Sequence, residues 1–196
     1  FLNTLSKKEI NSGIGEMAHY FLVSGKEDVA YFKLRYQKAM QLNVNACEQL
    51  IFKSLNIKKR FIEKDEFDKK ERLLLNYGHT YGHAIESITN FKIPHGIAVA
   101  HGMNMANFIS HKLGLLKYEK FEMVREILDP ICKDYLPKNI NINHLIKALK
   151  KDKKNINSNI RSILAKDIGH MIVREIVVND NFKKILYEFK RKYFRL

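Results

Sequence analysis

The chain has 196 residues, 45% of them hydrophobic and 29% charged, which is enough for one domain of ordinary size with a filled core. No apolar run reaches the roughly 18 residues that a transmembrane helix needs, so no membrane association is expected. The net charge of +14 favours an anionic small molecule over nucleic acid, because the lysines are dispersed and no zinc-finger or RNA-binding aromatic motif is present.

Two further features indicate the compartment and the extent of the chain. Cys47 and Cys132 lack the spacing of a metal site, and they are typical of reduced core cysteines in a cytoplasmic protein. The N-terminal segment has no basic region followed by an apolar stretch, so it does not predict a secretory signal. A chain that starts at Phe1 is expected to be a fragment of a longer protein.

The first third of the chain predicts three helices. Ser6 and Glu9 form a capping box at the start of the first one, and apolar residues then recur at helical spacing. A later run places apolar residues three and four positions apart, as in an amphipathic helix. The predicted helices are residues 6–23, residues 26–40, and a longer one from Asn43 or Asn45 to about residue 63.

Residues 69–89 predict a further helix, which carries an unusual pair of glycines. Gly78 and Gly82 are four residues apart, so on a helix they would share one stripe. A glycine inside a helix costs about 1 kcal/mol relative to alanine. Two glycines on one stripe therefore indicate that another backbone or a ligand comes close.

The same stretch carries a histidine pair. His79 and His83 are four residues apart and would lie one above the other on a helix face. Imidazole pairs at this spacing commonly hold a transition metal. A zinc site needs at least three protein ligands, and His95, directly after Pro94, is the nearest further candidate. Spacing alone leaves both His79 and His83 as candidate ligands.

The rest of the chain predicts more helices and one short β element. Pro94 opens a buried helix that ends at Gly114, and β-rich segments flank Gly169, as in a small hairpin. No strand followed by a glycine-rich phosphate loop is present. The expected fold is one mainly α, multi-helix domain with one small β-hairpin. Its remaining elements are helices at 117–132, from Asn141 or Asn143, and from Asp180 or Asn181 to Tyr193, and β segments at 160–165 and 171–178.

Three motifs together resemble one protein family. They are Ser-Gly-x-x-Glu at residues 12–16, Arg-x-x-x-Asn-x-Gly-His-Thr-x-Gly-His-Ala-Ile-Glu at residues 72–86, and His-Gly-x-Ala-Val-Ala-x-Gly-Met at residues 95–103. Their polar residues fall in register with the 3-dehydroquinate synthases and other sugar phosphate cyclases. The resemblance implies the C-terminal domain of the dehydroquinate synthase-like fold, with residues 1–196 as a single domain that binds metal and substrate.

The resemblance also implies roles for particular residues. It assigns His83 to proton relay, one turn away from the ligand His79, although spacing alone would allow both to bind the metal. By the resemblance, the metal ligands are Glu16, His79 and His95, the substrate contacts are Lys58, Arg72, Asn76 and Lys153, and the catalytic residues are His83 and Asp68.

The implied activity belongs to a longer enzyme. The resemblance implies a lyase of the shikimate pathway, which serves aromatic amino acid biosynthesis and converts 3-deoxy-D-arabino-heptulosonate 7-phosphate to 3-dehydroquinate with release of phosphate. It also implies NAD, Zn²⁺ or Co²⁺, and a homodimer. The N-terminal NAD-binding α/β domain of the family is absent from this chain, so the chain alone is expected to be inactive and to bind no NAD tightly.

Two other interpretations stay open. The family usually has Lys where this chain has His19, and often Glu where it has Ile97, which favours another cyclase acting on a different phosphorylated sugar. Arg72 and Asn76 favour dehydroquinate synthesis. The third interpretation is a basic helical binding module without a metal, and it predicts that the histidines do not converge.

Overall fold

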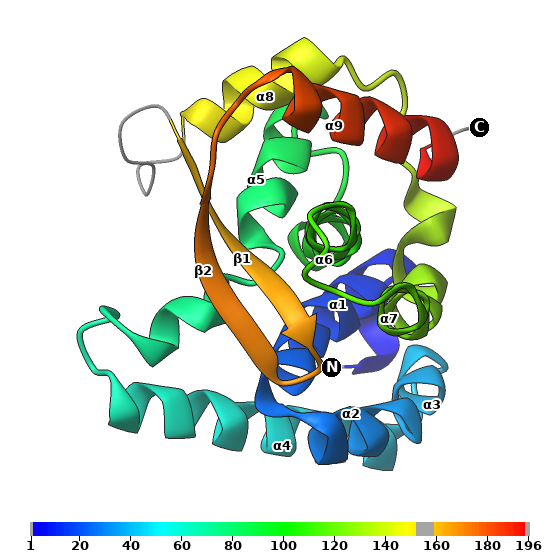
Figure 1. Cartoon of the computed structure of the whole chain (residues 1–196). Coiled ribbons are helices and arrows are strands. Elements are labelled where there is room, and N and C mark those ends of the chain that lie inside the picture. Colours follow the sequence, from blue (N-terminus) through cyan, green and yellow to red (C-terminus); the bar gives the residue numbers. More distant parts are fainter. Residues whose placement is uncertain (1, 152–158, 195–196) are drawn as a thin grey trace.

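The computed structural model describes residues 2–151 and 159–194, so Lys153, a predicted substrate contact, lies outside the described residues. Helices dominate, and one antiparallel hairpin follows α8 (Figure 1). The elements are η1 (Leu2–Thr4), α1 (Lys7–Ser24), α2 (Lys26–Lys33), α3 (Tyr36–Met40), α4 (Val44–Lys64), η2 (Glu71–Asn76), α5 (His79–Ile88), α6 (His95–Lys112), α7 (Tyr118–Cys132), η3 (Lys133–Tyr135), α8 (Ile142–Lys150), β1 (Ile160–Asp167), β2 (His170–Ile176) and α9 (Asp180–Tyr193).

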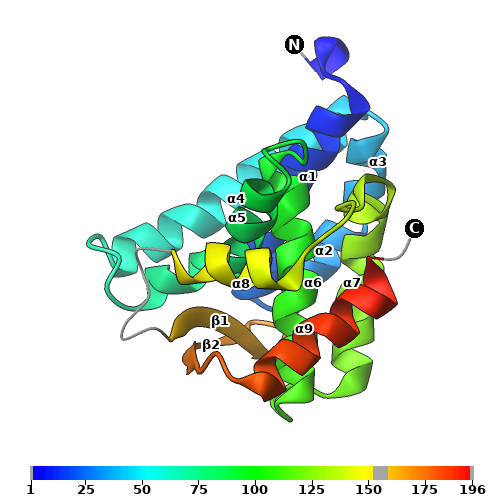
Figure 2. The same ribbon diagram turned by 90° about the horizontal axis from the view of Figure 1, so that it is seen from above.

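Helix α6 forms the centre of the fold. It is seen end-on in the middle of Figure 1 and contacts α1, α5, α7, α9 and β1. Every residue from Gly96 to Ser110 is buried, as expected for a helix that is apolar on all sides. Helices α8 and α9 cover one side of this core (Figure 2), and α1 separates α6 from the layer of α2, α3 and α4 on the other.

Glycines allow the backbones around α6 to touch. A Cβ atom on Gly96 would lie 1.8 Å from the carbonyl oxygen of Ser12 in α1, and one on Gly102 would lie 2.1 Å from the carbonyl oxygen of Gly78. Both distances are far below van der Waals contact, so only glycine fits at these crossings. The expectation that another backbone approaches the glycine pair is thus met by α6.

The prediction of one continuous helix at residues 69–89 is wrong in one respect. The chain forms the 3₁₀ helix η2, breaks at Tyr77 and Gly78, and only then enters α5. Gly78 has a φ of 81°, in the left-handed region, and therefore lies at the N-cap rather than on a helical stripe with Gly82. His79 and His83 still share α5, so their four-residue spacing remains helical.

Other predicted elements are confirmed with small changes. The capping box of Ser6 and Glu9 opens α1, and Asn43 caps α4 by accepting a hydrogen bond from the amide of Ala46. The predicted helix at residues 26–40 is two helices, α2 and α3, because the chain leaves helical geometry at Arg35, whose φ is −124°. The hairpin is confirmed, with Ile160 of β1 opposite Ile176 of β2.

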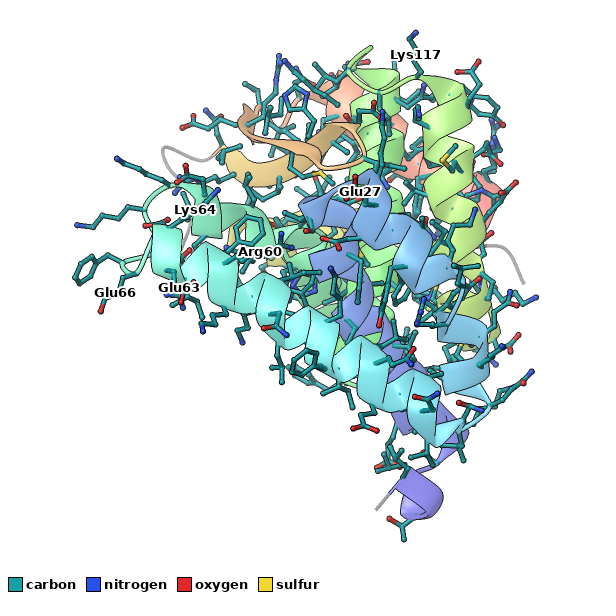
Figure 3. All side chains as sticks on the ribbon, turned by 90° about the horizontal axis from the view of Figure 1, so that it is seen from below. Glu27, Arg60, Glu63, Lys64, Glu66 and Lys117 are labelled. Atoms are coloured by element: carbon teal, nitrogen blue, oxygen red, sulfur yellow. The ribbon has the colours of Figure 1, made fainter. Side chains whose placement is uncertain are left out.

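Charged side chains fix α4 on the outer layer. The carboxylate of Asp28 in α2 lies 2.8 Å from Lys53 Nζ and accepts a hydrogen bond of 3.0 Å from Arg60 Nη2. Figure 3 shows this face, where Glu63 and Lys64 project outward at the end of α4.

None of the described helices combines the length and the apolar composition that crossing a bilayer would need.

The glycine contacts predict opposite effects for two equivalent substitutions. Gly102→Ala should lower the free energy of unfolding by about 1–3 kcal/mol or more, because the added methyl group collides with backbone atoms. Gly13→Ala should raise it by roughly 0.5–1 kcal/mol, because Gly13 lies in α1 with no atom within 4 Å of the new Cβ. Chemical denaturation of both variants measures this, and equal effects of the two changes would contradict the packing described.

The buried ring of His101 predicts a pH dependence of stability. Burial lowers the pKa of His101 to about 4, whereas the unfolded chain binds this proton below about pH 6.5. The free energy of unfolding should therefore have its full value above pH 6.5 and decrease by up to about 3 kcal/mol as the pH drops to 4. His101→Gln should remove this part of the slope in denaturation curves, and the exposed His144→Gln should not.

Candidate metal centre

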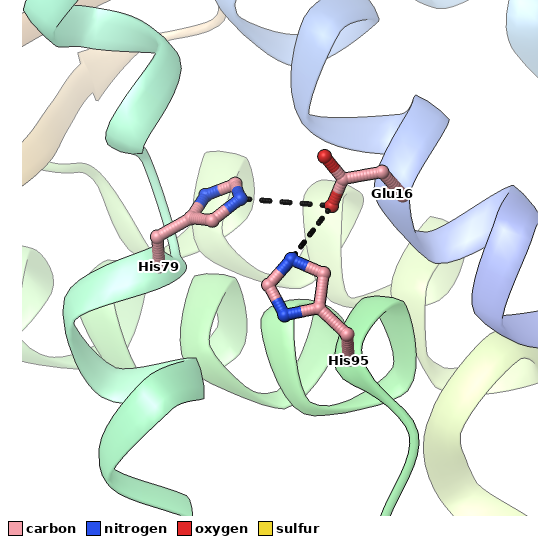
Figure 4. Close-up of side chains that lie close together, drawn as sticks. All are labelled: Glu16, His79 and His95. Carbon is pink, nitrogen blue, oxygen red and sulfur yellow. Dashed lines mark ion pairs between the residues drawn. The ribbon is translucent and has the colours of Figure 1, made fainter. Parts of the chain in front are cut away.

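Three helices bring one carboxylate and two imidazoles together. Glu16 comes from the middle of α1, His79 from the first residue of α5 and His95 from the first residue of α6. Glu16 Oε2 lies 3.6 Å from His79 Nε2 and 3.3 Å from His95 Nε2 (Figure 4). The Ser12 hydroxyl accepts a hydrogen bond of 3.0 Å from the Gly96 amide, which holds α1 against the start of α6 and thus Glu16 beside His95.

The spacing of these atoms fits a metal ion. One ligand atom from each of the three residues lies within 4.8 Å of the other two. Zinc bonds of about 2.0–2.2 Å in tetrahedral geometry place neighbouring ligand atoms about 3.3 Å apart, close to the 3.3 and 3.6 Å found. Glu16 Oε2 is also shielded from solvent without a well-formed hydrogen bond, which a buried carboxylate oxygen rarely tolerates unless something else binds it.

The other ring nitrogen of each histidine has a partner that orients it. His79 Nδ1 lies 3.3 Å from the carbonyl oxygen of Tyr77, and His95 Nδ1 lies 3.1 Å from Glu86 Oε2. A proton on Nδ1 satisfies each partner and leaves the Nε2 lone pair directed at Glu16. Both imidazoles are thus oriented for metal binding through Nε2.

Electrostatic interactions between the side chains of the cluster favour charge on Glu16 and His95. Burial raises the pKa of Glu16, but the interactions with the nearby rings of His79 and His95 outweigh it and hold this pKa well below its usual range. The interaction with Glu16, opposed by burial and aided by Glu86, raises the pKa of His95 to about 9. The carboxylates of Glu16 and Glu86 therefore favour positive charge at this position.

His19 is part of the same cluster, although it is fully buried at 1% exposure. Its ring packs edge-on against His79, with 4.9 Å between ring centroids, and lies 3.9 Å from the ring of Tyr20. Burial, followed by the proximity of His79, lowers the pKa of His19 to about 3. A neutral His19 therefore forms one wall of the cluster, which spacing in the sequence did not indicate.

His83 lies at the exposed edge of the cluster, one turn after His79 on α5. Its ring centroid is 5.5 Å from that of His79 and 5.6 Å from that of His95. Ligand atoms of His83, Glu86 and His95 also come within 4.8 Å of one another. His83 is not a member of the Glu16 group among the described residues, so His79 is the histidine of the spaced pair that faces Glu16.

The predicted substrate contacts that the structure describes, Lys58, Arg72 and Asn76, lie on elements that border the cluster. Lys58 is exposed on α4, with Nζ 6.0 Å from the centroid of Tyr20. Arg72 and Asn76 lie on η2, which packs against α1 and α4 and leads directly into α5. Arg72 Nη1 donates a hydrogen bond of 2.7 Å to the carbonyl of Glu66.

Asp68 lies in the loop between α4 and η2, where it is exposed and has a φ of 55°. It belongs to neither group of potential metal ligands found among the described residues. The loop itself is shaped by Asp65, whose carboxylate accepts hydrogen bonds from the amides of Lys69, Lys70 and Arg72. Asp65 therefore holds the loop that carries Asp68.

Glu86 is the other residue that sequence reasoning missed. It was part of the family motif but had no assigned function, and it proves to be 9% exposed and paired with His95. Its position offered a usable signal. Glu86 follows His79 by seven residues, which is about two helical turns and therefore the same face of α5.

The chain is similar in sequence to proteins of one family. Residues 13–155 match the profile of the family described as 3-dehydroquinate synthase C-terminal. The 3-dehydroquinate synthase of Campylobacter concisus is 36% identical over 194 residues, which cover 97% of this chain and 54% of that protein. The 3-dehydroquinate synthase of Clostridium perfringens is 42% identical over 174 residues, covering 86% and 48% respectively.

Two solved structures share the fold. The 2-epi-5-epi-valiolone synthase from Streptomyces hygroscopicus, with NAD⁺ and Zn²⁺ bound, has a TM-score of 0.76 at 18% identity and covers 97% of this chain and 54% of its own. The 2-deoxy-scyllo-inosose synthase complexed with carbaglucose-6-phosphate, NAD⁺ and Co²⁺ has a TM-score of 0.71 at 19% identity, with the same coverage. At these identities the likeness establishes the fold alone.

The fold and the cluster define a mainly helical domain with a candidate metal centre of two histidines and one glutamate. The chain belongs to the 3-dehydroquinate synthase C-terminal family. It spans about half the length of the curated relatives that it matches.

Proposed function

We propose that Glu16, His79 and His95 bind Zn²⁺ or Co²⁺ and that this chain is the metal- and substrate-binding domain of a 3-dehydroquinate synthase. The observation that carries the proposal is the convergence of Glu16 Oε2 with the Nε2 atoms of both histidines from three separate helices. Two imidazoles and a carboxylate are a common protein ligand set for catalytic zinc, which keeps a further position open for substrate or water.

The relatives support the reaction. The curated relatives at 36% and 42% identity are 3-dehydroquinate synthases, so the proposed reaction is conversion of 3-deoxy-D-arabino-heptulosonate 7-phosphate to 3-dehydroquinate with release of phosphate. Because those relatives are about twice as long, we assign NAD binding to an N-terminal domain outside these 196 residues. The two related cyclases of known structure contain NAD⁺ with Zn²⁺ or Co²⁺, which supports both cofactors.

The chain's own side chains would share the remaining work. When bound, the metal supplies a Lewis acid that polarises a substrate oxygen. We assign Lys58, Arg72 and Lys153 to the phosphate and carboxylate groups of the substrate, because cations bind these anions and Arg does so with two parallel hydrogen bonds. Asn76 would orient the substrate beside them.

Proton transfer is assigned to exposed residues at the edge of the cluster. His83 lies one turn from His79 and is exposed, so its imidazole is accessible for proton exchange with substrate and solvent. Asp68, in the loop that precedes η2, is proposed as a second proton-handling residue.

A second candidate is the same domain of another sugar phosphate cyclase. The observation that favours it is His19, which occupies the wall of the cluster as a buried neutral ring where the family usually has Lys. Ile97 is fully buried and so fits its place as a core residue. Assays of the full-length enzyme on different phosphorylated sugars separate the two candidates. The third interpretation, a module whose histidines do not converge, disagrees with the distances found.

The proposal predicts different outcomes for the two histidines of the spaced pair. His79→Ala should remove most bound zinc, because it deletes one of three ligands, whereas His83→Ala should retain full zinc stoichiometry. In the full-length enzyme, His83→Ala should nevertheless lose turnover by about 100-fold or more. Elemental analysis after expression in zinc-replete medium measures the metal content.

Two results would contradict these assignments. Full zinc content in His79→Ala would reject His79 as a ligand. Zinc loss in His83→Ala would show that spacing, rather than the family pattern, identifies the ligands. His144→Ala serves as the matched control, because His144 is exposed on α8, away from the cluster.

A further inference from the structure

We infer that Glu86 is a positioning residue that fixes His95 for metal binding, an inference that rests on the proposed metal site. His95 lies between two carboxylates, with Nε2 3.3 Å from Glu16 and Nδ1 3.1 Å from Glu86. The two contacts use opposite sides of the imidazole ring. One carboxylate is therefore a partner in metal binding, and the other can determine which ring nitrogen is available for it.

The burial of Glu86 indicates that its pairing with His95 is a specific structural interaction. The side chain of Glu86 is 11% exposed, whereas that of His95 is 43% exposed. A carboxylate removed from water to this extent is costly unless it is paired and hydrogen-bonded. Glu86 meets that requirement through His95, and it stands on the rigid helix α5, so its position does not depend on the more exposed histidine.

The loop between α5 and α6 folds back toward Glu86. Asn90 and Phe91 both have positive φ values, 49° and 57°, in the left-handed region that side chains other than glycine seldom adopt. The Phe91 amide donates a hydrogen bond of 2.8 Å to the backbone carbonyl of Glu86. This tight turn brings the start of α6, and with it His95, back over the Glu86 side chain.

The Nδ1 atoms of His79 and His95 have chemically different partners. His79 Nδ1 faces a neutral backbone carbonyl, but His95 Nδ1 faces a carboxylate. A carboxylate partner holds the proton on Nδ1 and makes the ring a stronger electron donor at Nε2. Glu86 should therefore strengthen the bond from His95 to the metal in addition to orienting the ring.

The test compares zinc dissociation constants of this chain and its variants by competition with a chromophoric chelator. Glu86→Gln keeps the size of the side chain but removes its charge, and it should weaken zinc binding about 10- to 100-fold, the usual range for such supporting groups. Glu27→Gln, the same change at an exposed site on α2, should leave the constant unchanged. The stoichiometry should remain one zinc per chain.

A double-mutant cycle separates positioning from a merely structural role. If Glu86 acts through His95, Glu86→Gln should have no further effect in a His95→Ala background, so the double variant should bind zinc as His95→Ala does. Additive losses would instead assign Glu86 to general stability and overturn the inference. The Co²⁺ absorption spectrum adds a second readout, since Glu86→Gln should shift its visible bands at saturating metal.

The outcomes also distinguish this inference from the proposed function. Wild-type affinity in Glu86→Gln, with zinc still bound by the parent chain, overturns the role of Glu86 and leaves the metal site intact. Absence of zinc binding by the parent chain overturns both. Two zinc ions per chain would instead make Glu86 a direct ligand together with His83 and His95, which also contradicts the positioning role.

Discussion

The direct backbone contact of α6 with α1 and α5 is the constraint on which the rest of the structure depends. Gly96 meets the carbonyl of Ser12, and Gly102 meets that of Gly78, so three helices approach more closely than side chains would permit. Glu16, His79 and His95 all lie within a few residues of these crossings. Backbone packing therefore determines the position of the cluster, and it brings the side chains of Glu16, His79 and His95 close enough to meet.

That arrangement concentrates opposite charges in a partly enclosed space. Two carboxylates, Glu16 and Glu86, flank the imidazole of His95, and their negative charge raises the pKa of this ring to about 9. A divalent cation would replace the proton and satisfy the buried oxygen of Glu16. The same residues thus explain why the cluster would accept a metal ion.

Local patterns in the sequence were sufficient for much of the fold. The capping box of Ser6 and Glu9, the Asn43 cap and the helical apolar spacing depend on neighbouring residues, so they could be recognised without tertiary information. The break before α5 could not, because it depends on a tertiary contact: at the left-handed Gly78 an added Cβ would collide with Met103 and Val99 of α6. Periodicity alone continues a helix through such a position.

The candidate site shows the same division. Its ligands could be proposed from a family motif, but spacing alone did not choose between His79 and His83, which both lie on α5. The choice depends on which of the two rings faces Glu16 on α1, and only the tertiary structure shows this. The supporting role of Glu86 was hidden for a similar reason, since its partner His95 belongs to another helix.

Anomalous diffraction at the zinc absorption edge, from crystals of this chain grown with zinc, tests the central claim most directly. The account predicts one strong peak, bonded at about 2.0–2.2 Å to an oxygen of Glu16 and to Nε2 of His79 and His95. A peak coordinated by His83 in place of His79, or one located away from these three residues, would contradict it.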